Sequence, residues 1–158
     1  MNKRSVIVLV PLLALFSATQ AQQDLSSSLL AVARSVAPVE VEDSELAAAI
    51  ESGLWNPDRS AIATVIPRSE ASVILVYLRQ SDGSFLATDA SGVESGNFGF
   101  FGRPRSDYER FETEPIEWRQ RDDGRFQVVM RTRAWRMGQR YTVAEPLLID
   151  PDGTVLYR

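Results

Sequence analysis

The chain has 158 residues, with 17 basic and 21 acidic side chains, no histidine and no cysteine. The formal net charge of −4 argues against generic nucleic-acid binding, because a phosphate backbone attracts basic surfaces. The missing residue types exclude Ser-His-Asp and Cys-His nucleophiles, disulfides, haem ligation and the usual zinc sites, so we expect neither a cofactor nor a metal site.

The N-terminus has the three parts of a cleavable secretory signal peptide. A basic start is followed by an apolar run of eleven residues, Val6–Phe16, and then by the small residues Thr19 and Ala21 at the −3 and −1 positions of a cleavage site. The run is shorter than the ~20 residues that a membrane-spanning helix needs. We therefore expect cleavage after Ala21, no membrane span, and one domain over residues 22–158 in the periplasm or outside the cell.

Loss of residues 1–21 also changes the chemistry that the chain can perform. Lys3 is the only lysine, and with Arg4 it accounts for two of the 17 basic residues, so the mature chain would carry 15 arginines against 21 acids. Without lysine, Schiff-base chemistry is excluded as well. Binding is therefore a better expectation than catalysis, although carboxylates could still act as acids or bases.

Two helices are expected at the start of the mature chain. The first covers residues 24–36, where apolar residues recur at helical spacing: Leu25, Leu29, Val32 and Val36. The second covers residues 44–53, with Asp43 or Ser44 as its N-cap and Gly53 at its end. We expect the two residues after Gly53 to extend its apolar stripe.

The rest of the chain has the pattern of β-strands. Apolar, β-branched runs predict short strands over 61–66, 72–79 and 85–88, the last two joined by a turn at Asp82-Gly83. Further strands are expected over 110–121, 125–136, 139–149 and 154–158, connected by the turns Asp122-Asp123-Gly124, Met137-Gly138 and Asp150-Pro151-Asp152-Gly153. The final strand could be an open sheet edge.

Between these groups, residues 89–108 form a Gly/Phe-rich stretch without periodicity. Loops of this length are uncommon in compact domains and are often functional. Its aromatic residues either cover the core or form a patch for a partner: Phe98, Phe100 and Phe101.

The strand register follows from keeping one face apolar. Pairing across the predicted turns sets Trp118 opposite Val128 and Ile116 opposite Met130. It also sets Tyr141, Val143 and Leu147 beside the apolar positions of strand 125–136. We expect this face to meet the helices. The predicted fold class is α+β, with two N-terminal helices packed on one face of an antiparallel meander of about 5–7 strands.

The opposite face of the same strands is the candidate binding surface. It collects cations and one tryptophan, which we name the Arg/Trp face: Arg119, Arg121, Arg131, Arg133, Trp135 and Arg140. Cross-strand neighbours lie about 5 Å apart, so these side chains would form a patch. The patch could hold an anionic envelope component or an acidic protein partner, or it could be an ordinary solvated face.

One carboxylate, Glu145, falls in the apolar register between Val143 and Leu147. If buried there, it would have a raised pKa and could act as a general base. Alternatively, a bulge at Glu145-Pro146 would turn it to the other face, because proline within a strand favours bulges and edges.

Three functions remain open from the sequence. The preferred one is a non-catalytic binding or accessory module of the bacterial envelope that uses the Arg/Trp face for an anionic partner. The second is a cone-shaped α+β pocket protein, either a small-ligand carrier or a carboxylate-based enzyme with Glu145 as its base. The third is a secreted inhibitor or surface-assembly subunit that pairs through a sheet edge.

Overall fold

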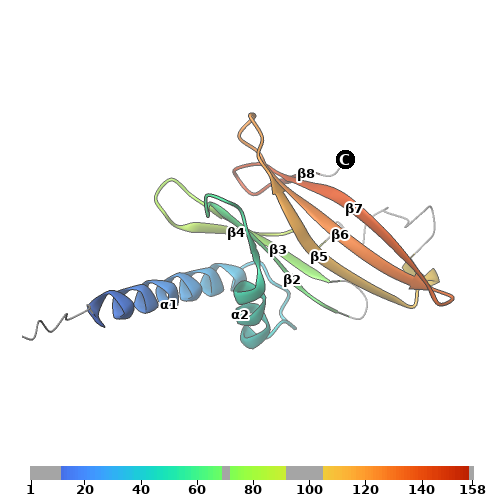
Figure 1. The fold of residues 1–158 in the computed structure, drawn as a ribbon, viewed down its shortest axis with the longest axis horizontal. Coiled ribbons are helices and arrows are strands. Elements are labelled where there is room, and N and C mark those ends of the chain that lie inside the picture. The colour runs from blue at the N-terminus through green and yellow to red at the C-terminus, as the bar shows by residue number, and fades with distance from the viewer. Residues whose placement is uncertain (1–11, 69–71, 92–104, 157–158) are drawn as a thin grey trace, which may run out of the picture.

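The structure is a computed structural model that describes residues 12–68, 72–91 and 105–156 (Figure 1). Two helices, α1 (Leu12–Arg34) and α2 (Asp43–Ser52), precede two four-stranded antiparallel sheets. The first sheet contains β1 (Leu54–Trp55), β2 (Ala61–Ile66), β3 (Val73–Arg79) and β4 (Phe85–Asp89). A short 3-10 helix (Arg105–Asp107) precedes the second sheet, which contains β5 (Arg110–Arg119), β6 (Phe126–Arg136), β7 (Gln139–Ile149) and β8 (Val155–Leu156).

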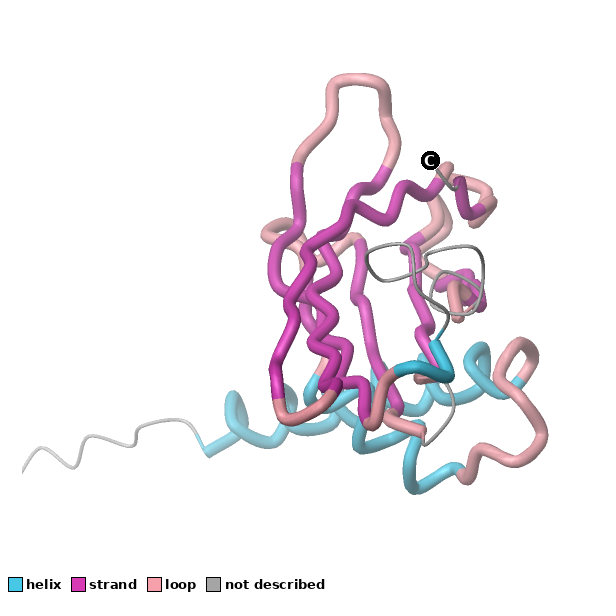
Figure 2. The backbone as a smooth tube through the Cα atoms, turned by 90° about the vertical axis from the view of Figure 1, so that its right-hand side faces the viewer, coloured by secondary structure: helices cyan, strands magenta, loops and turns pink. Residues whose placement is uncertain are grey.

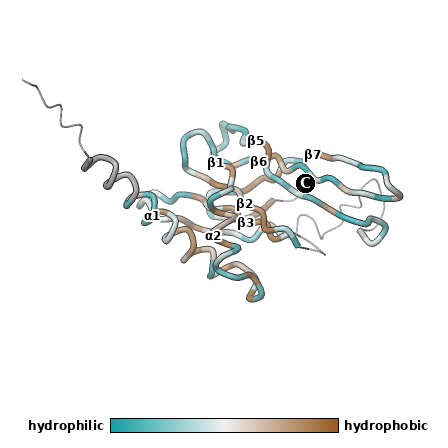
Figure 3. The backbone as a smooth tube through the Cα atoms, turned by 60° about the horizontal axis from the view of Figure 1, so that its bottom comes forward, coloured by the Kyte–Doolittle hydropathy of each residue, from teal (hydrophilic) through white to brown (hydrophobic). Residues whose placement is uncertain are grey.

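The α+β class is confirmed, but the single predicted meander is wrong. The strands form two separate sheets, each ordered as in the sequence, and the helices lie on the far side of the first sheet from the second (Figures 1 and 2). The first sheet is the middle layer because β3 is apolar on both faces and buried along most of its length. Figure 3 shows hydrophobic colour along β2 and β3.

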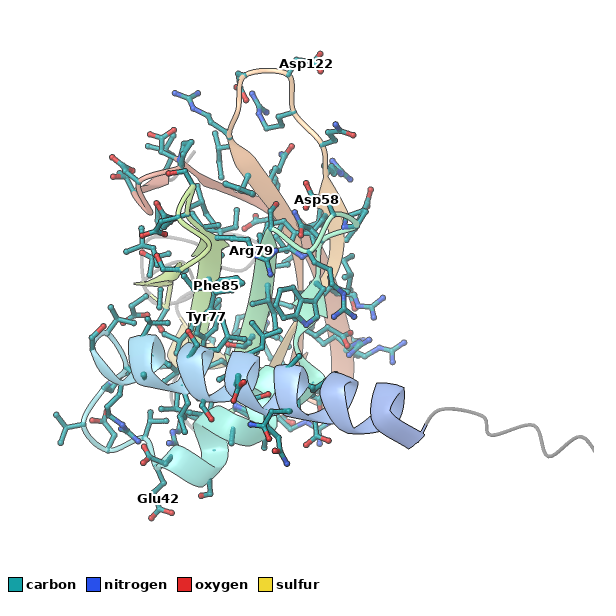
Figure 4. All side chains as sticks on the ribbon, turned by 90° about the vertical axis from the view of Figure 1, so that its left-hand side faces the viewer. Glu42, Asp58, Tyr77, Arg79, Phe85 and Asp122 are labelled. Atoms are coloured by element: carbon teal, nitrogen blue, oxygen red, sulfur yellow. The ribbon has the colours of Figure 1, made fainter. Side chains whose placement is uncertain are left out.

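One core lies between the helices and the first sheet. Leu29 of α1 and Leu46 of α2 pack with Leu75 and Tyr77 of β3, and all four are buried. Figure 4 labels Tyr77, which lies behind α1 in that view. Within α1, the first described residue that packs against this core is Leu25, and Gln20–Asp24 are exposed. The helix itself runs without a break through Ala21, so it begins earlier than predicted. No helix in the described part of the chain is long and apolar enough to cross a membrane.

The two ends of α2 are defined by Glu42 and Gly53. Its N-cap is Glu42, which forms a capping box with Glu45, so the predicted caps Asp43 and Ser44 are wrong. At the other end, a Cβ on Gly53 would lie 2.7 Å from Cδ1 of Ile62, closer than two carbon atoms can approach. Residues Leu54–Trp55 do not extend the helical stripe; they form β1 and pair with β2.

A second core lies between the two sheets. Ala63, Ile74 and Val76 of the first sheet contact Val128 and Leu147 of the second. The apolar face of the second sheet therefore meets the first sheet and not the helices, contrary to our expectation. Predicting the partner of that face would have required knowing that the first four strands form a sheet of their own.

The register of the second sheet confirms most predicted pairs and corrects one. Trp118 lies opposite Val128, and the turn Met137-Gly138, with both φ angles positive, sets Tyr141 opposite Ala134, Val143 opposite Thr132 and Leu147 opposite Val128. Ile116 does not pair with Met130. The register shifts between Pro115 and Glu117, so Pro115 faces Met130 and Ile116 is 36% exposed. Prolines within sheets are typically found at such bulges or at edges.

Two further predictions concern chain segments near the ends of strands. Residues 92–104, which include Phe98, Phe100 and Phe101, lie outside the described residues. The predicted last strand, 154–158, is described only as the two-residue β8, which pairs with Leu148 and Ile149 of β7.

Candidate functional site

The Arg/Trp face is built from alternate residues of three neighbouring strands. At one end of the sheet, β6 lies between β5 and β7, and three cross-strand rows face the same side. The rows, given in the order β5, β6 and β7, are Arg110–Trp135–Arg140, Glu112–Arg133–Thr142 and Glu114–Arg131–Ala144. Because side chains alternate along a strand, these nine residues form one surface opposite the apolar face.

Two glutamates form ion pairs with the arginines of this surface. One carboxylate oxygen of Glu114 accepts hydrogen bonds from Nε of Arg131 at 2.8 Å and from Nη2 of Arg133 at 2.6 Å. These guanidiniums, Arg131 first, lower the pKa of Glu114. Glu112 lies 3.2 Å from the guanidinium of Arg110 and 3.8 Å from that of Arg133. The charges of Arg131 and Arg133 are therefore largely compensated within the sheet.

The positive charge of the row Arg110–Trp135–Arg140, which lies at the strand ends, is less compensated by carboxylates. The guanidinium carbon of Arg110 lies 3.9 Å from the ring centroid of Trp135, a close cation–π contact. On the other side, Arg140 pairs with Trp135 across the ladder, is exposed, and has no carboxylate partner within the described residues. Trp135 is thus a half-buried aromatic ring with an arginine on each neighbouring strand.

The structure therefore divides the predicted Arg/Trp face. Arg131, Arg133, Trp135 and Arg140 lie together, whereas Arg119 pairs with Gln127, six residues and about 20 Å along β6 from Arg133. Arg121 lies beyond the end of β5, where it binds Asp123. From here on, the Arg/Trp face denotes the nine residues of the three rows.

Arg110 is the member that sequence reasoning missed. Unbroken pairing from Trp118 and Val128 would place Phe111, not Arg110, opposite Trp135. The register shift at Ile116 moves the earlier half of β5 by one residue and brings Arg110 to that position. The proline at 115 was the only signal in the sequence that could have indicated the shift.

Glu145 lies in a regular part of β7. It pairs with Met130, and the neighbouring pairs Arg131–Ala144 and Val129–Pro146 continue the register, so the bulge considered at Glu145-Pro146 is not formed. The residue is half-buried and stays on the side of Met130. It does not line the cleft between the β1–β2 turn and the β5–β6 hairpin.

Neither metal-ligand chemistry nor similarity to known proteins assigns a function to these residues. No group of three or more carboxylate, histidine or cysteine side chains that could hold a metal ion occurs among the described residues. No protein-family model matches this chain, and no curated protein or solved structure is significantly similar to it. Function is therefore inferred from the geometry of these residues.

Proposed function

We propose that this protein is an exported, non-catalytic binding module that contacts an anionic partner through the Arg/Trp face. The observation that carries the proposal is the row Arg110–Trp135–Arg140, in which an aromatic ring lies between two arginines on an exposed sheet face. Tryptophan and arginine are the residues that most often dominate binding energy at protein interfaces.

The charge of the face supports an anionic partner. The three rows carry four arginines against two glutamates, although the chain as a whole has a net charge of −4. Within the described residues, no carboxylate pairs with Arg140, which leaves its guanidinium donors for a ligand. The guanidinium of Arg110 lies over the Trp135 ring and 3.2 Å from Glu112, and with five N–H donors it keeps others for carboxylate or phosphate oxygens.

The shape of the face favours a large partner over a small molecule. Small ligands bind in concave sites that cover most of their surface, whereas this site is the outer face of a sheet. The backbones of Arg110 and Arg140 lie two strand spacings apart, about 10 Å. Such spacing suits repeated negative charges, as on an acidic protein surface or an anionic polymer of the cell envelope.

The removal of residues 1–21 is compatible with the way α1 packs. If residues 1–21 are removed, the helix that remains still contains Leu25, Leu29 and Ala33, which contact the core. The described residues next to the cleavage position, Gln20–Asp24, are exposed and would not disturb the core when cut. The absence of histidine and cysteine, together with the loss of the only lysine, favours binding over catalysis.

Affinity capture from the cell-envelope fraction tests this proposal. The immobilised protein should retain a partner that is eluted by salt and is lost with Trp135→Ala or Arg140→Ala. The control is Arg79→Ala, because Arg79 is an exposed arginine of the first sheet, stacked on Phe85. Equal recovery with all three variants would overturn the proposal. Arg131 and Arg133 are not suitable targets, since their removal would leave Glu114 without its partners.

A further inference from the structure

A cleft lies at the opposite end of the second sheet from the row Arg110–Trp135–Arg140. Its volume is about 400 Å³, within the range of small-molecule sites. One wall is the turn between β1 and β2, and the other is the β5–β6 hairpin; Figure 4 labels Asp58 on the first and Asp122 on the second. The cleft therefore lies between an element of the first sheet and an element of the second.

The wall formed by the β1–β2 turn is held by its own hydrogen bonds. Oδ1 of Asn56 accepts from the backbone N–H of Ala61 at 2.8 Å, and its Nδ2 donates to Oγ of Ser60 at 2.9 Å. Asp58 accepts from the backbone N–H and the hydroxyl of Ser60 at 2.9 and 2.6 Å. Because these polar groups bind one another, the turn is a preformed wall.

The opposite wall includes three arginines: Arg119, Arg121 and Arg125. Their carboxylate partners do not line the cleft, so they hold the guanidiniums from outside it. Nε and Nη2 of Arg121 bind Asp123 at 3.0 and 2.6 Å, and Nε of Arg125 binds Asp150 at 2.7 Å. A guanidinium has five N–H donors, so each of these arginines keeps donors for a ligand.

The remaining lining is partly apolar. Trp118 and Phe126 line the cleft with their rings at 82° and 6.5 Å between centroids, and Pro57 lies on the opposite wall. Asp58 is the one carboxylate among the lining residues, and its hydrogen bonds from Ser60 lower its pKa, so it is ionised at neutral pH. An ionised carboxylate in the wall disfavours a second anionic group on the ligand beside it.

We propose that this cleft binds a small ligand that carries a single oxyanion group, carboxylate or phosphate, on a flat apolar body. The oxyanion accepts hydrogen bonds from Arg121 and Arg125, whose planar guanidiniums can each bind two oxygens of a carboxylate or of a phosphate. The apolar body lies against Trp118 and Phe126. This site is separate from the Arg/Trp face, and neither depends on the other.

The test is a titration of the purified, ¹⁵N-labelled protein followed by NMR. Phenyl phosphate or benzoate should shift the indole N–H signal of Trp118 and the Nε–H signals of Arg121 and Arg125, in a saturable manner with one Kd. The indole signal of Trp135 should stay in place. Comparing the two probes identifies the preferred oxyanion, inorganic phosphate should bind more weakly than phenyl phosphate, and neutral benzyl alcohol should not bind.

Substitutions complete the test. Arg121→Ala should weaken the binding of the preferred probe about tenfold or more, as expected for loss of a charge-assisted hydrogen bond. Arg140→Ala, on the Arg/Trp face, should leave it unchanged. If Arg121→Ala unfolds the protein, Arg125→Ala takes its place. Any one of three results would overturn the proposal. Benzyl alcohol could bind as tightly as phenyl phosphate, no probe could shift the Trp118 signal in a saturable manner, or the substitution in the cleft could leave the affinity equal to that of Arg140→Ala.

Discussion

The indole Nε1 of Trp118 donates a hydrogen bond to the carbonyl oxygen of Leu54 at 2.8 Å, and this bond joins the two sheets. Trp118 belongs to β5, and Leu54 begins β1, the edge strand of the first sheet. The bond also lies beside the cleft, whose lining includes Trp118. It therefore couples the position of the first sheet to the shape of the cleft.

Replacing Trp118 with phenylalanine should lower the free energy of unfolding by about 1–2 kcal/mol. The substitution keeps an aromatic ring but leaves the Leu54 carbonyl without its donor. Urea denaturation measures the change. Trp135→Phe is the control and should cost less, because the described residues show no hydrogen bond from the Trp135 indole and phenylalanine keeps an aromatic ring beside Arg110. Equal losses in the two variants would show that the bond between the sheets contributes nothing specific.

Gly53→Ala should destabilise the protein by about 1–3 kcal/mol through overpacking. The new methyl group would lie 2.7 Å from Cδ1 of Ile62 and 2.9 Å from Cγ2 of Thr64, and Ile62 is fully buried. Thermal unfolding of this variant should be compared with that of Glu51→Ala, an exposed change in the same helix. A melting temperature unchanged by Gly53→Ala would mean that the helix end and β2 are farther apart than described.

Stability should fall steeply between pH 10 and pH 12 because of Tyr77. Burial raises the pKa of its hydroxyl to about 12, and the described residues provide no hydrogen-bond partner in good geometry. In the unfolded chain the hydroxyl ionises near pH 10, so the contribution of Tyr77 to the free energy of unfolding is complete below that pH. Above pH 10 it falls by about 1.4 kcal/mol per pH unit. Tyr77→Phe should remove this component of the alkaline transition and be no less stable at pH 7. A loss of several kcal/mol at pH 7 would show instead that the hydroxyl makes a strong bond.

The carboxyl of Asp123 should titrate at about pH 2. Hydrogen bonds from Arg121 are the largest cause of its lowered pKa, followed by a hydrogen bond from the backbone of Arg125 and by the charges of both arginines. This depressed pKa contributes stability above the pKa of the unfolded chain, and the contribution is lost as the pH falls towards 2. In Arg121→Ala, NMR titration should show the pKa moving up towards 3.8, while that of Asp82, which Ser84 lowers, stays the same. Identical values for Asp123 with and without Arg121 would contradict the ion pair.

Local sequence patterns predicted most of the elements. Turn residues and alternation placed the strands that became β2 and β7 within a residue of their ends, because both signals depend on neighbours in the chain. The division into two sheets was not predictable in this way. The apolar run of residues 72–79 indicated a strand, and the structure shows it buried along most of its length, but the run cannot tell which element covers each face.

The candidate surface could be predicted only where the pairing of the strands followed an unbroken register. Alternation along β6 brought Arg131, Arg133 and Trp135 to one face, as the sequence indicated. The bulge at Ile116 then replaced Phe111 by Arg110 opposite Trp135, and the ion pairs of Glu114 compensated the arginines that had seemed most available. Bulges and ion pairs depend on contacts between strands, which no local pattern reports.

The most direct test of the proposed function is a charge reversal at Arg140. Binding of the captured envelope partner should be measured for the unmodified protein, for Arg140→Glu and for Arg79→Glu, over a range of salt concentrations. We expect Arg140→Glu to abolish salt-sensitive binding and Arg79→Glu to retain it, because Arg140 lies beside Trp135 whereas Arg79 belongs to the first sheet. Binding that survives Arg140→Glu with the same affinity and the same salt dependence would contradict the assignment of the Arg/Trp face.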